Sequence, residues 1–192
     1  MNPGMLLIGH HGCDRDVGEE VLAGRADLKP SNNDYDWLGQ GVYFWQDDEQ
    51  RAWDWAEKRH GKRACVIGAV IQPLSCLDML QTEAFRLVRA AYDDLRHYHE
   101  TSQLSLPENR PWKGELVIRR LDCAVIQFLH QTRQQNGAQP FDVIRAAFPE
   151  GSPLYPNAGF LDRSHIQLCV RDTHSILGYF RPNGLRKSKH LL

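Results

Sequence analysis

Four short segments of the sequence combine polar or aromatic side chains with glycine in patterns that favour a ligand site. The first is His10-His11-Gly12, which ends an apolar run that begins at Met5. A histidine followed by glycine at a strand end can offer a ligand both an imidazole and an accessible main chain. Alone, the pattern is more often structural. A zinc site would need further ligands, and the sequence holds no HExxH motif or Cys/His cluster to supply them.

The second segment is the aromatic run Gly41–Trp45, which follows a Gly-Gln-Gly turn. Strand alternation puts Val42 and Phe44 on one face, and Tyr43 and Trp45 on the other. If the first pair faces the core, the phenol of Tyr43 is free to line a cleft. The alternative is an aromatic strand that packs on both faces.

The third segment, Arg51–Ala56, carries two Trp and two Ala and is expected to pack a helix against that aromatic strand. The fourth is Ser164–Arg171, in which the apolar Ile, Leu and Val share one face. Gln167 therefore points the other way, toward solvent or into a polar cleft. Alternation does not decide between these two environments.

The helices and strands that must position these segments are predicted from the spacing of apolar residues and from the Pro-, Gly- and Asn-rich stretches that interrupt it. Helices are predicted from Asp14 or Asp16 to Leu22 and over 47–59, about 80–95 and about 115–135. Strands are predicted over 5–12, 41–45, 64–71, 141–148, 165–171 and 175–180, the last two as a hairpin. Loops are expected at 29–36 and 149–158. We predict one domain, 1–192, in which β-rich ends flank a helical insert at roughly 75–136, and the class α+β.

Composition fits an ordinary soluble protein, with 42% hydrophobic and 24% charged residues in 192. Basic residues (23) nearly balance acidic ones (24), so the net charge does not favour binding to nucleic acid. A local basic patch that binds nucleic acid remains compatible with this composition. Five cysteines without a CxxC pair are expected to be reduced, buried thiols of a cytoplasmic protein.

We expect neither a targeting signal nor a membrane-spanning segment in this sequence. Met1–Gly4 lacks a basic n-region, and no run approaches the roughly 20 apolar residues that cross a bilayer, so no membrane partner is expected. The basic tail Leu185–Leu192 is expected to be a solvated terminus.

In chain order the segments read His-Gly, Gly-Gln-Gly-Val-Tyr-Phe, a helix with Ala-Trp-Asp-Trp-Ala, and a polar residue on a late strand. This order resembles the His-Tyr-Glu branch of the ADP-ribosyltransferase superfamily, the branch of poly(ADP-ribose) polymerases and diphtheria-type toxins. Asp36–Ala56 also resembles small bacterial members of that superfamily. The resemblance covers the first third of the chain and, less closely, 160–181, and it does not extend to the helical middle at roughly 75–136.

The resemblance implies two packed, mainly antiparallel sheets that form a cleft for NAD⁺ as co-substrate, with no metal. His11 would hydrogen-bond the adenosine ribose, and the Gly12 backbone would hold the nicotinamide amide. Tyr43 would stack on the nicotinamide ring, and Gly41 belongs to the same donor-binding strand. Gln167 would hydrogen-bond the nicotinamide ribose. His10 is the alternative to His11, which is preferred because glycine follows it directly.

Gln167 departs from the family pattern, which has glutamate or a substitute there. A carboxylate can stabilise positive charge on the ribose and help to deprotonate an acceptor, whereas an amide does neither by charge. We therefore expect transfer of one ADP-ribose unit, not polymer synthesis. A general base must come from elsewhere, with Asp34, Asp36 and Asp162 as candidates, unless the acceptor is already nucleophilic.

The expected function is a mono-ADP-ribosyltransferase, a bacterial toxin of a toxin–antitoxin or phage-defence system with a possible antitoxin partner. The acceptor would be a macromolecule, either nucleic acid (RNA or DNA) or protein. Tyr155, Phe160 and Arg163, in the loop before Gln167, could stack on and neutralise nucleic acid, or simply pin a surface loop. Alternatives are an NAD⁺ glycohydrolase and a non-catalytic NAD- or ADP-ribose-binding module. A tRNA 2′-phosphotransferase would need a basic set that the sequence does not offer convincingly.

Overall fold

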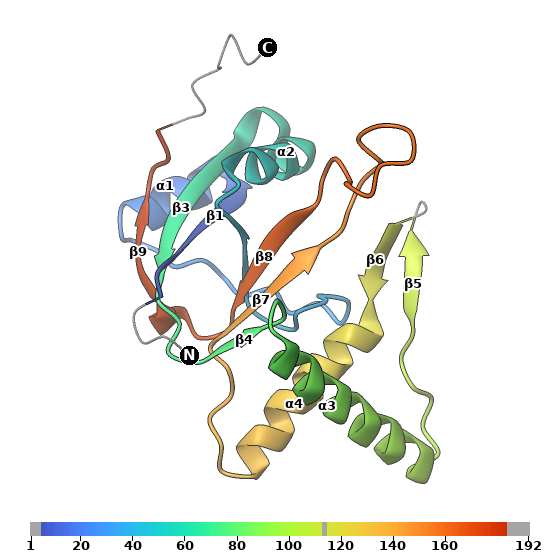
Figure 1. The fold of residues 1–192 in the computed structure, drawn as a ribbon. Helices are drawn as coiled ribbons and strands as arrows, with labels where there is room; N and C mark the ends of the chain where they lie inside the picture. Colours follow the sequence, from blue (N-terminus) through green and yellow to red (C-terminus); the bar gives the residue numbers. More distant parts are fainter. Residues whose placement is uncertain (1–4, 113–114, 184–192) are drawn as a thin grey trace.

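A seven-stranded sheet forms the centre of the computed structural model, which describes residues 5–112 and 115–183 (Figure 1). Its order is β4-β7-β8-β2-β1-β3-β9, and the strands are antiparallel except for β4 and β7. The bounds are β1 Leu7–Asp14, β2 Val42–Gln46, β3 Ala64–Ile71, β4 Cys76–Asp78, β7 Val143–Phe148, β8 His165–Val170 and β9 Ile176–Phe180. The expectations for Met1–Gly4 and Leu185–Leu192 fall outside the described residues.

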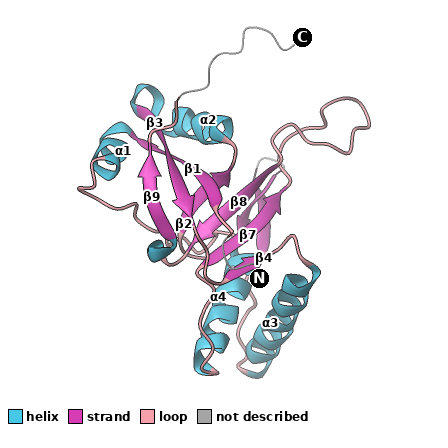
Figure 2. Cartoon of the chain, turned by 60° about the vertical axis from the view of Figure 1, so that its left-hand side comes forward, coloured by secondary structure: helices cyan, strands magenta, loops and turns pink. Residues whose placement is uncertain are grey.

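Within residues 5–112 and 115–183, four helices and a small second sheet accompany the large sheet, which is compatible with the predicted α+β class (Figure 2). The helices are α1 Arg15–Leu22, α2 Glu49–His60, α3 Thr82–Thr101 and α4 Arg120–Gln135, with 3₁₀ turns at Gly61–Arg63 and Thr173–Ser175. The small sheet pairs β5, Asn109–Trp112, with β6, Glu115–Arg119. In the described ranges, none of the helices has the length and apolar character needed to cross a membrane.

Local sequence chemistry fixes the starts of α1 and α2. The Asp14 carboxylate accepts a hydrogen bond from the backbone N–H of Asp16, and Asp48 accepts one from the N–H of Arg51. Such caps satisfy N–H groups that have no partner within the helix. The last turn of α2 carries basic residues, which the helix dipole favours. Each capped helix thus follows a strand of the large sheet, α1 directly after β1 and α2 two residues after β2.

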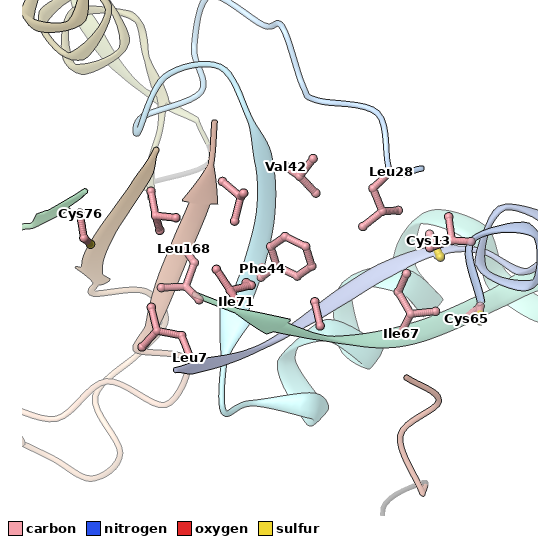
Figure 3. Packing of buried hydrophobic residues seen from close by; sticks show 14 residues of the cluster. Leu7, Cys13, Leu28, Val42, Phe44, Cys65, Ile67, Ile71, Cys76 and Leu168 are labelled. Atoms are coloured by element: carbon pink, nitrogen blue, oxygen red, sulfur yellow. The ribbon is translucent and has the colours of Figure 1, made fainter. Parts of the chain in front are cut away.

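Apolar side chains cover both faces of the sheet. Figure 3 shows the first cluster, where Val42 and Phe44 of β2 pack with Leu168 of β8. The opposite face carries one cluster beneath α3 and α4 and another beneath α2. The predicted alternation in β2 and β8 is therefore confirmed. All five cysteines are buried.

Three predictions about the fold are wrong. Strands β8 and β9 do not form a hairpin, because β8 pairs with β2 and β7 whereas β9 pairs with β3 at the far edge. The Asp172 side chain instead caps the 3₁₀ turn that redirects the chain. Residues 115–119 form β6, so the helix predicted from 115 begins at Arg120; Val117 and Ile118 are β-branched and favour a strand.

The third wrong prediction is that of two packed sheets. The two halves are hydrogen-bonded into one sheet through the pairs Gly9–Gln46 and His10–Trp45. Sequence patterns also did not reveal the short strand β4, which lies at the start of the predicted helical insert. This strand pairs in parallel with β7, outside the insert. Alternation within a strand does not specify which strand lies beside it.

His130 of α4 should make the fold sensitive to acid. It is 2% exposed, and neither ring nitrogen has a hydrogen-bond partner among the described residues. Burial, with Arg171 and Arg133 nearby, lowers its pKa from 6.5 to about 3. Below pH 6.5 the unfolded chain therefore binds a proton that the fold excludes, so stability falls as pH falls toward 3.

We expect His130→Leu to raise the melting temperature more at pH 5 than at pH 8, because leucine removes this proton-linked loss. Thermal unfolding at the two pH values measures the effect. The control is His97→Leu, an exposed position on α3, which should leave the pH dependence unchanged. An equal shift at both pH values for His130→Leu would contradict the burial argument.

Candidate functional site

The large sheet opens between β1 and β2. These strands pair at Gly9–Gln46 and His10–Trp45, and then β1 continues along β3 to Asp14 while β2 follows β8. The opening borders a cavity of about 570 Å³. That volume lies within the range of small-molecule sites, roughly 300–1,000 Å³. A local divergence of two strands therefore creates room for a ligand at the centre of the sheet.

The cavity brings together the residues predicted to bind the donor. Its lining includes residues from β1, from β2 with its preceding turn, and from β8: His11, Gly12, Gly41, Tyr43 and Gln167. His10 does not belong to the lining; its ring lies 6.3 Å, centroid to centroid, from that of Phe180 on β9. Of the two neighbouring histidines, the structure thus places His11 at the cavity.

His11 bridges the opening in the sheet. Its Nδ1 lies 2.8 Å from the backbone oxygen of Tyr43, and its ring packs on Phe44. Burial lowers the pKa of His11, the hydrogen bond to Tyr43 opposes this shift, and nearby His60 adds to it. Because a carbonyl only accepts, Nδ1 must carry the proton, and in the neutral ring Nε2 is then an acceptor. An acceptor of this kind suits a ligand hydroxyl.

Tyr43 contributes its ring to the cavity, but its hydroxyl is not free, contrary to the sequence prediction. The hydroxyl donates to the backbone oxygen of Gly39 at 2.8 Å and accepts from the N–H of Leu38 at 3.0 Å. Burial strongly raises its pKa, so the phenol stays neutral. The turn before β2 therefore holds the Tyr43 ring in place as part of the cavity wall. The hydroxyl is hydrogen-bonded to that turn and does not serve in proton transfer.

Gln167 lies in a polar part of the cavity, which settles the choice that alternation left open. Its Oε1 accepts a hydrogen bond from Nε1 of Trp37 at 2.7 Å, and both residues line the cavity. With the oxygen held by the indole, the amide NH₂ is the group left for a ligand. Trp37 had no assigned role from sequence, because its partner is distant in the chain.

Glu150 is a second cavity residue that sequence reasoning missed. Its carboxylate pairs with Arg51 of α2 at 2.8 Å, and the two side chains are only 17% and 14% exposed. Arg163 and His165 lie 3.5 and 3.8 Å from the same carboxylate. Burial lowers the pKa of His165. This ionic cluster joins α2 to the end of β7 at the cavity wall.

The predicted general-base candidates are not equivalent in space. Asp36 lines the cavity, where it accepts hydrogen bonds from the Ser31 hydroxyl and the Asn33 N–H. Asp34 pairs instead with Arg120, and Asp162 accepts from the Ser152 N–H; neither belongs to the lining. Asp36 is thus the one member of this set at the cavity.

The predicted acceptor residues lie outside the cavity. Tyr155 and Phe160 are 57% and 68% exposed on the loop between β7 and β8, which projects from the sheet (Figure 1). Arg163 connects this loop to Glu150. Neither aromatic side chain lines the cavity. Within the described ranges, no group of three or more His, Cys, Asp or Glu side chains is arranged to hold a metal ion.

Gly41 is required by close packing beside the cavity. A Cβ at this position would lie 2.6 Å from Sγ of Cys169 and 2.7 Å from the backbone oxygen of Val170. We expect Gly41→Ala to reduce the free energy of unfolding by about 1–3 kcal/mol, as overpacking does. The measurement is denaturant unfolding, with Gly178→Ala as control because nothing lies within 4 Å of a Cβ there. Equal stability of both variants would show that β8 can move aside.

Comparison with known proteins gives one distant relative. Uncharacterized protein MJ0359 of Methanocaldococcus jannaschii is 24% identical in an alignment of length 182 that covers 85% of this chain and 81% of the archaeal protein. No family model matches the chain, and no solved structure matches it. The archaeal protein's name states no activity, so the function has to be argued from the cavity itself.

Proposed function

We propose that this protein is an NAD⁺-dependent mono-ADP-ribosyltransferase, with a variant of the ADP-ribosyltransferase fold in which β1 and β2 join the two halves into one sheet, and that the cavity between β1 and β2 holds the nicotinamide end of NAD⁺. One observation carries the proposal. His11, Tyr43 and Gln167 come from three strands and line one cavity at the opening of the sheet. Their order along the chain resembles the His-Tyr-Glu branch, and their spatial grouping supports that resemblance independently of sequence order.

The side chains suit the chemistry of donor cleavage. The bond between ribose and nicotinamide breaks, its electron pair leaves with nicotinamide, and positive charge develops on the sugar ring. The fixed ring of Tyr43 offers a stacking surface for nicotinamide, and Nε2 of His11 can accept from a ribose hydroxyl. The Gln167 amide can orient the second ribose. Catalysis here rests on positioning the donor.

The second half of the reaction needs a nucleophile on the acceptor, which attacks the ribose carbon and loses a proton. Asp36 is the carboxylate proposed to take that proton, since it lines the cavity and the Glu150 carboxylate in the same lining is paired with Arg51. The absence of a carboxylate at Gln167 favours transfer of one unit. The exposed Tyr155 and Phe160 support a macromolecular acceptor that stacks on this loop, namely a nucleic acid. The resemblance extends the proposal to a cytoplasmic bacterial toxin with an antitoxin partner.

The test is incubation of purified protein with radiolabelled NAD⁺ and separate pools of RNA, DNA and lysate protein. Label in one pool, lost in both Tyr43→Ala and Gln167→Ala, is the expected result and identifies the acceptor class. Leu177→Ser, at an exposed position on β9, serves as the matched control. Release of nicotinamide without labelling of any acceptor would show that the protein is an NAD⁺ glycohydrolase and not a transferase. Binding of NAD⁺ without its cleavage would show that the protein is a binding module and would refute the proposed enzymatic activity.

A further inference from the structure

A second cavity, larger than the first, lies between the helical pair and the sheet. Its volume is about 780 Å³. Side chains from α3, α4 and the segment before α3 form most of its walls, among them Leu80, Phe85, Val88, Tyr92 and Val125. In Figure 2, α3 and α4 lie side by side below β4 and β7. Most of the cavity wall thus comes from the part of the chain that the family resemblance does not cover, whereas Trp37 and Leu38 belong to the part that it does.

The charged groups of this second cavity are already paired. Arg89 makes an ion pair with Asp93 at 3.0 Å, and Arg119 pairs with Asp122 through its Nε. Arg119 also stacks over Trp37, 4.5 Å from the ring centroid. Among the described lining residues, every charged side chain therefore has a partner. An ionic ligand would find no free counter-charge here, whereas a neutral apolar one would replace water on an apolar wall.

Trp37 is a common wall of the two cavities. Its ring contacts both the Arg119 guanidinium and Phe148, whose centroid is 4.8 Å away, and Arg119 in turn lies 5.5 Å from the Phe148 centroid. Its indole N–H holds the Gln167 oxygen at 2.7 Å. A molecule in the second cavity would therefore touch the side chain that orients Gln167 in the first.

We propose that the second cavity is a binding site for a neutral, hydrophobic small molecule, whose occupancy changes the position of Gln167 through Trp37. The volume matches sites that enclose small molecules, and apolar walls between helices are a common setting for them. The regulatory consequence rests on the proposed function, because it concerns Gln167. The site itself does not. Coupling of this kind is reciprocal, so a ligand in the first cavity would also alter affinity in the second.

The binding test uses N-phenyl-1-naphthylamine, a neutral aromatic fluorophore, titrated into the full chain. We expect saturable binding at one probe per chain, a loss of affinity of about tenfold or more in Leu80→Ser, and no change in Leu177→Ser. Leu80 and Leu177 are matched apolar positions, 44% and 57% exposed. A second variant, Val88→Trp, fills the cavity without making it polar and should also abolish binding. Thermal unfolding verifies that each variant is folded.

Non-saturable binding, or equal loss in the Leu80 and Leu177 variants, would overturn the site. So would a wild-type dimer that becomes monomeric in Leu80→Ser, since a second copy would then cover the cavity. The coupling is read without NAD⁺, from the indole N–H resonance of Trp37, assigned with Trp37→Phe. We expect saturating probe to shift this resonance. An unmoved resonance beside a bound probe would refute the coupling, and failure of NAD⁺ cleavage would refute only the proposed activity.

Discussion

Tyr43→Ala is expected to lower the rate of nicotinamide release from NAD⁺ by about 100-fold, while Tyr43→Phe stays within a few-fold of wild type. The ring is a wall of the cavity, and loss of a positioning surface can misplace the donor enough to cost about 10²-fold. The hydroxyl, by contrast, is used within the protein, where it joins Leu38 and Gly39 of the turn before β2. Ring and hydroxyl therefore contribute to different properties.

The two variants separate activity from stability. Tyr43→Phe leaves the Leu38 N–H and the Gly39 oxygen without this partner, which should reduce the free energy of unfolding by about 1–3 kcal/mol. Nicotinamide release is measured by chromatography, and stability by denaturant unfolding. If folded Tyr43→Phe were as inactive as Tyr43→Ala, the hydroxyl and not the ring would carry the function. The stacking role would then have to be abandoned.

Elements with a strong local signal could be predicted from sequence. The apolar run over Ala64–Ile71 coincides with β3, and the carboxylate at Asp14 does cap α1. Alternation placed Val42 and Phe44 correctly on one face of β2. These features depend on neighbours in the chain, which periodicity and capping describe.

Features that depend on spatial neighbours could not be predicted. Strand β9 reads as the partner of β8, but it lies at the other edge of the sheet against β3. Trp37 and Glu150 acquire meaning only through Gln167 and Arg51, which are far away in sequence. The hydroxyl of Tyr43 looked available because nothing local indicates that it bonds the preceding turn. The order of strands in the sheet therefore determines which side chains meet at the cavity, and this order could not be read from the sequence.

Gln167→Glu is expected to raise the rate of nicotinamide release by about 10- to 100-fold. The new carboxylate can keep the hydrogen bond from Trp37, because its oxygen replaces the amide oxygen. It also adds a negative charge where, in the proposed reaction, positive charge develops on the ribose. Two unit charges 4 Å apart interact by about 4 kcal/mol in a partly screened site, so even a fraction of that energy gives this gain. Gln167→Ala should instead lower the rate, since it leaves the indole unpaired.

Nicotinamide release at saturating NAD⁺ measures the effect, with Gln139→Glu as the control for added charge on an exposed position outside the cavity lining. If the rate in Gln167→Glu falls to that of Gln167→Ala, the amide NH₂ must donate to the donor, a role that a carboxylate does not perform. Gln167 would then be a specific hydrogen-bond donor and not a weakened form of the family glutamate. If the rate rises as expected, the natural glutamine limits turnover at the step where charge builds on the sugar, and single-unit transfer follows from that limit.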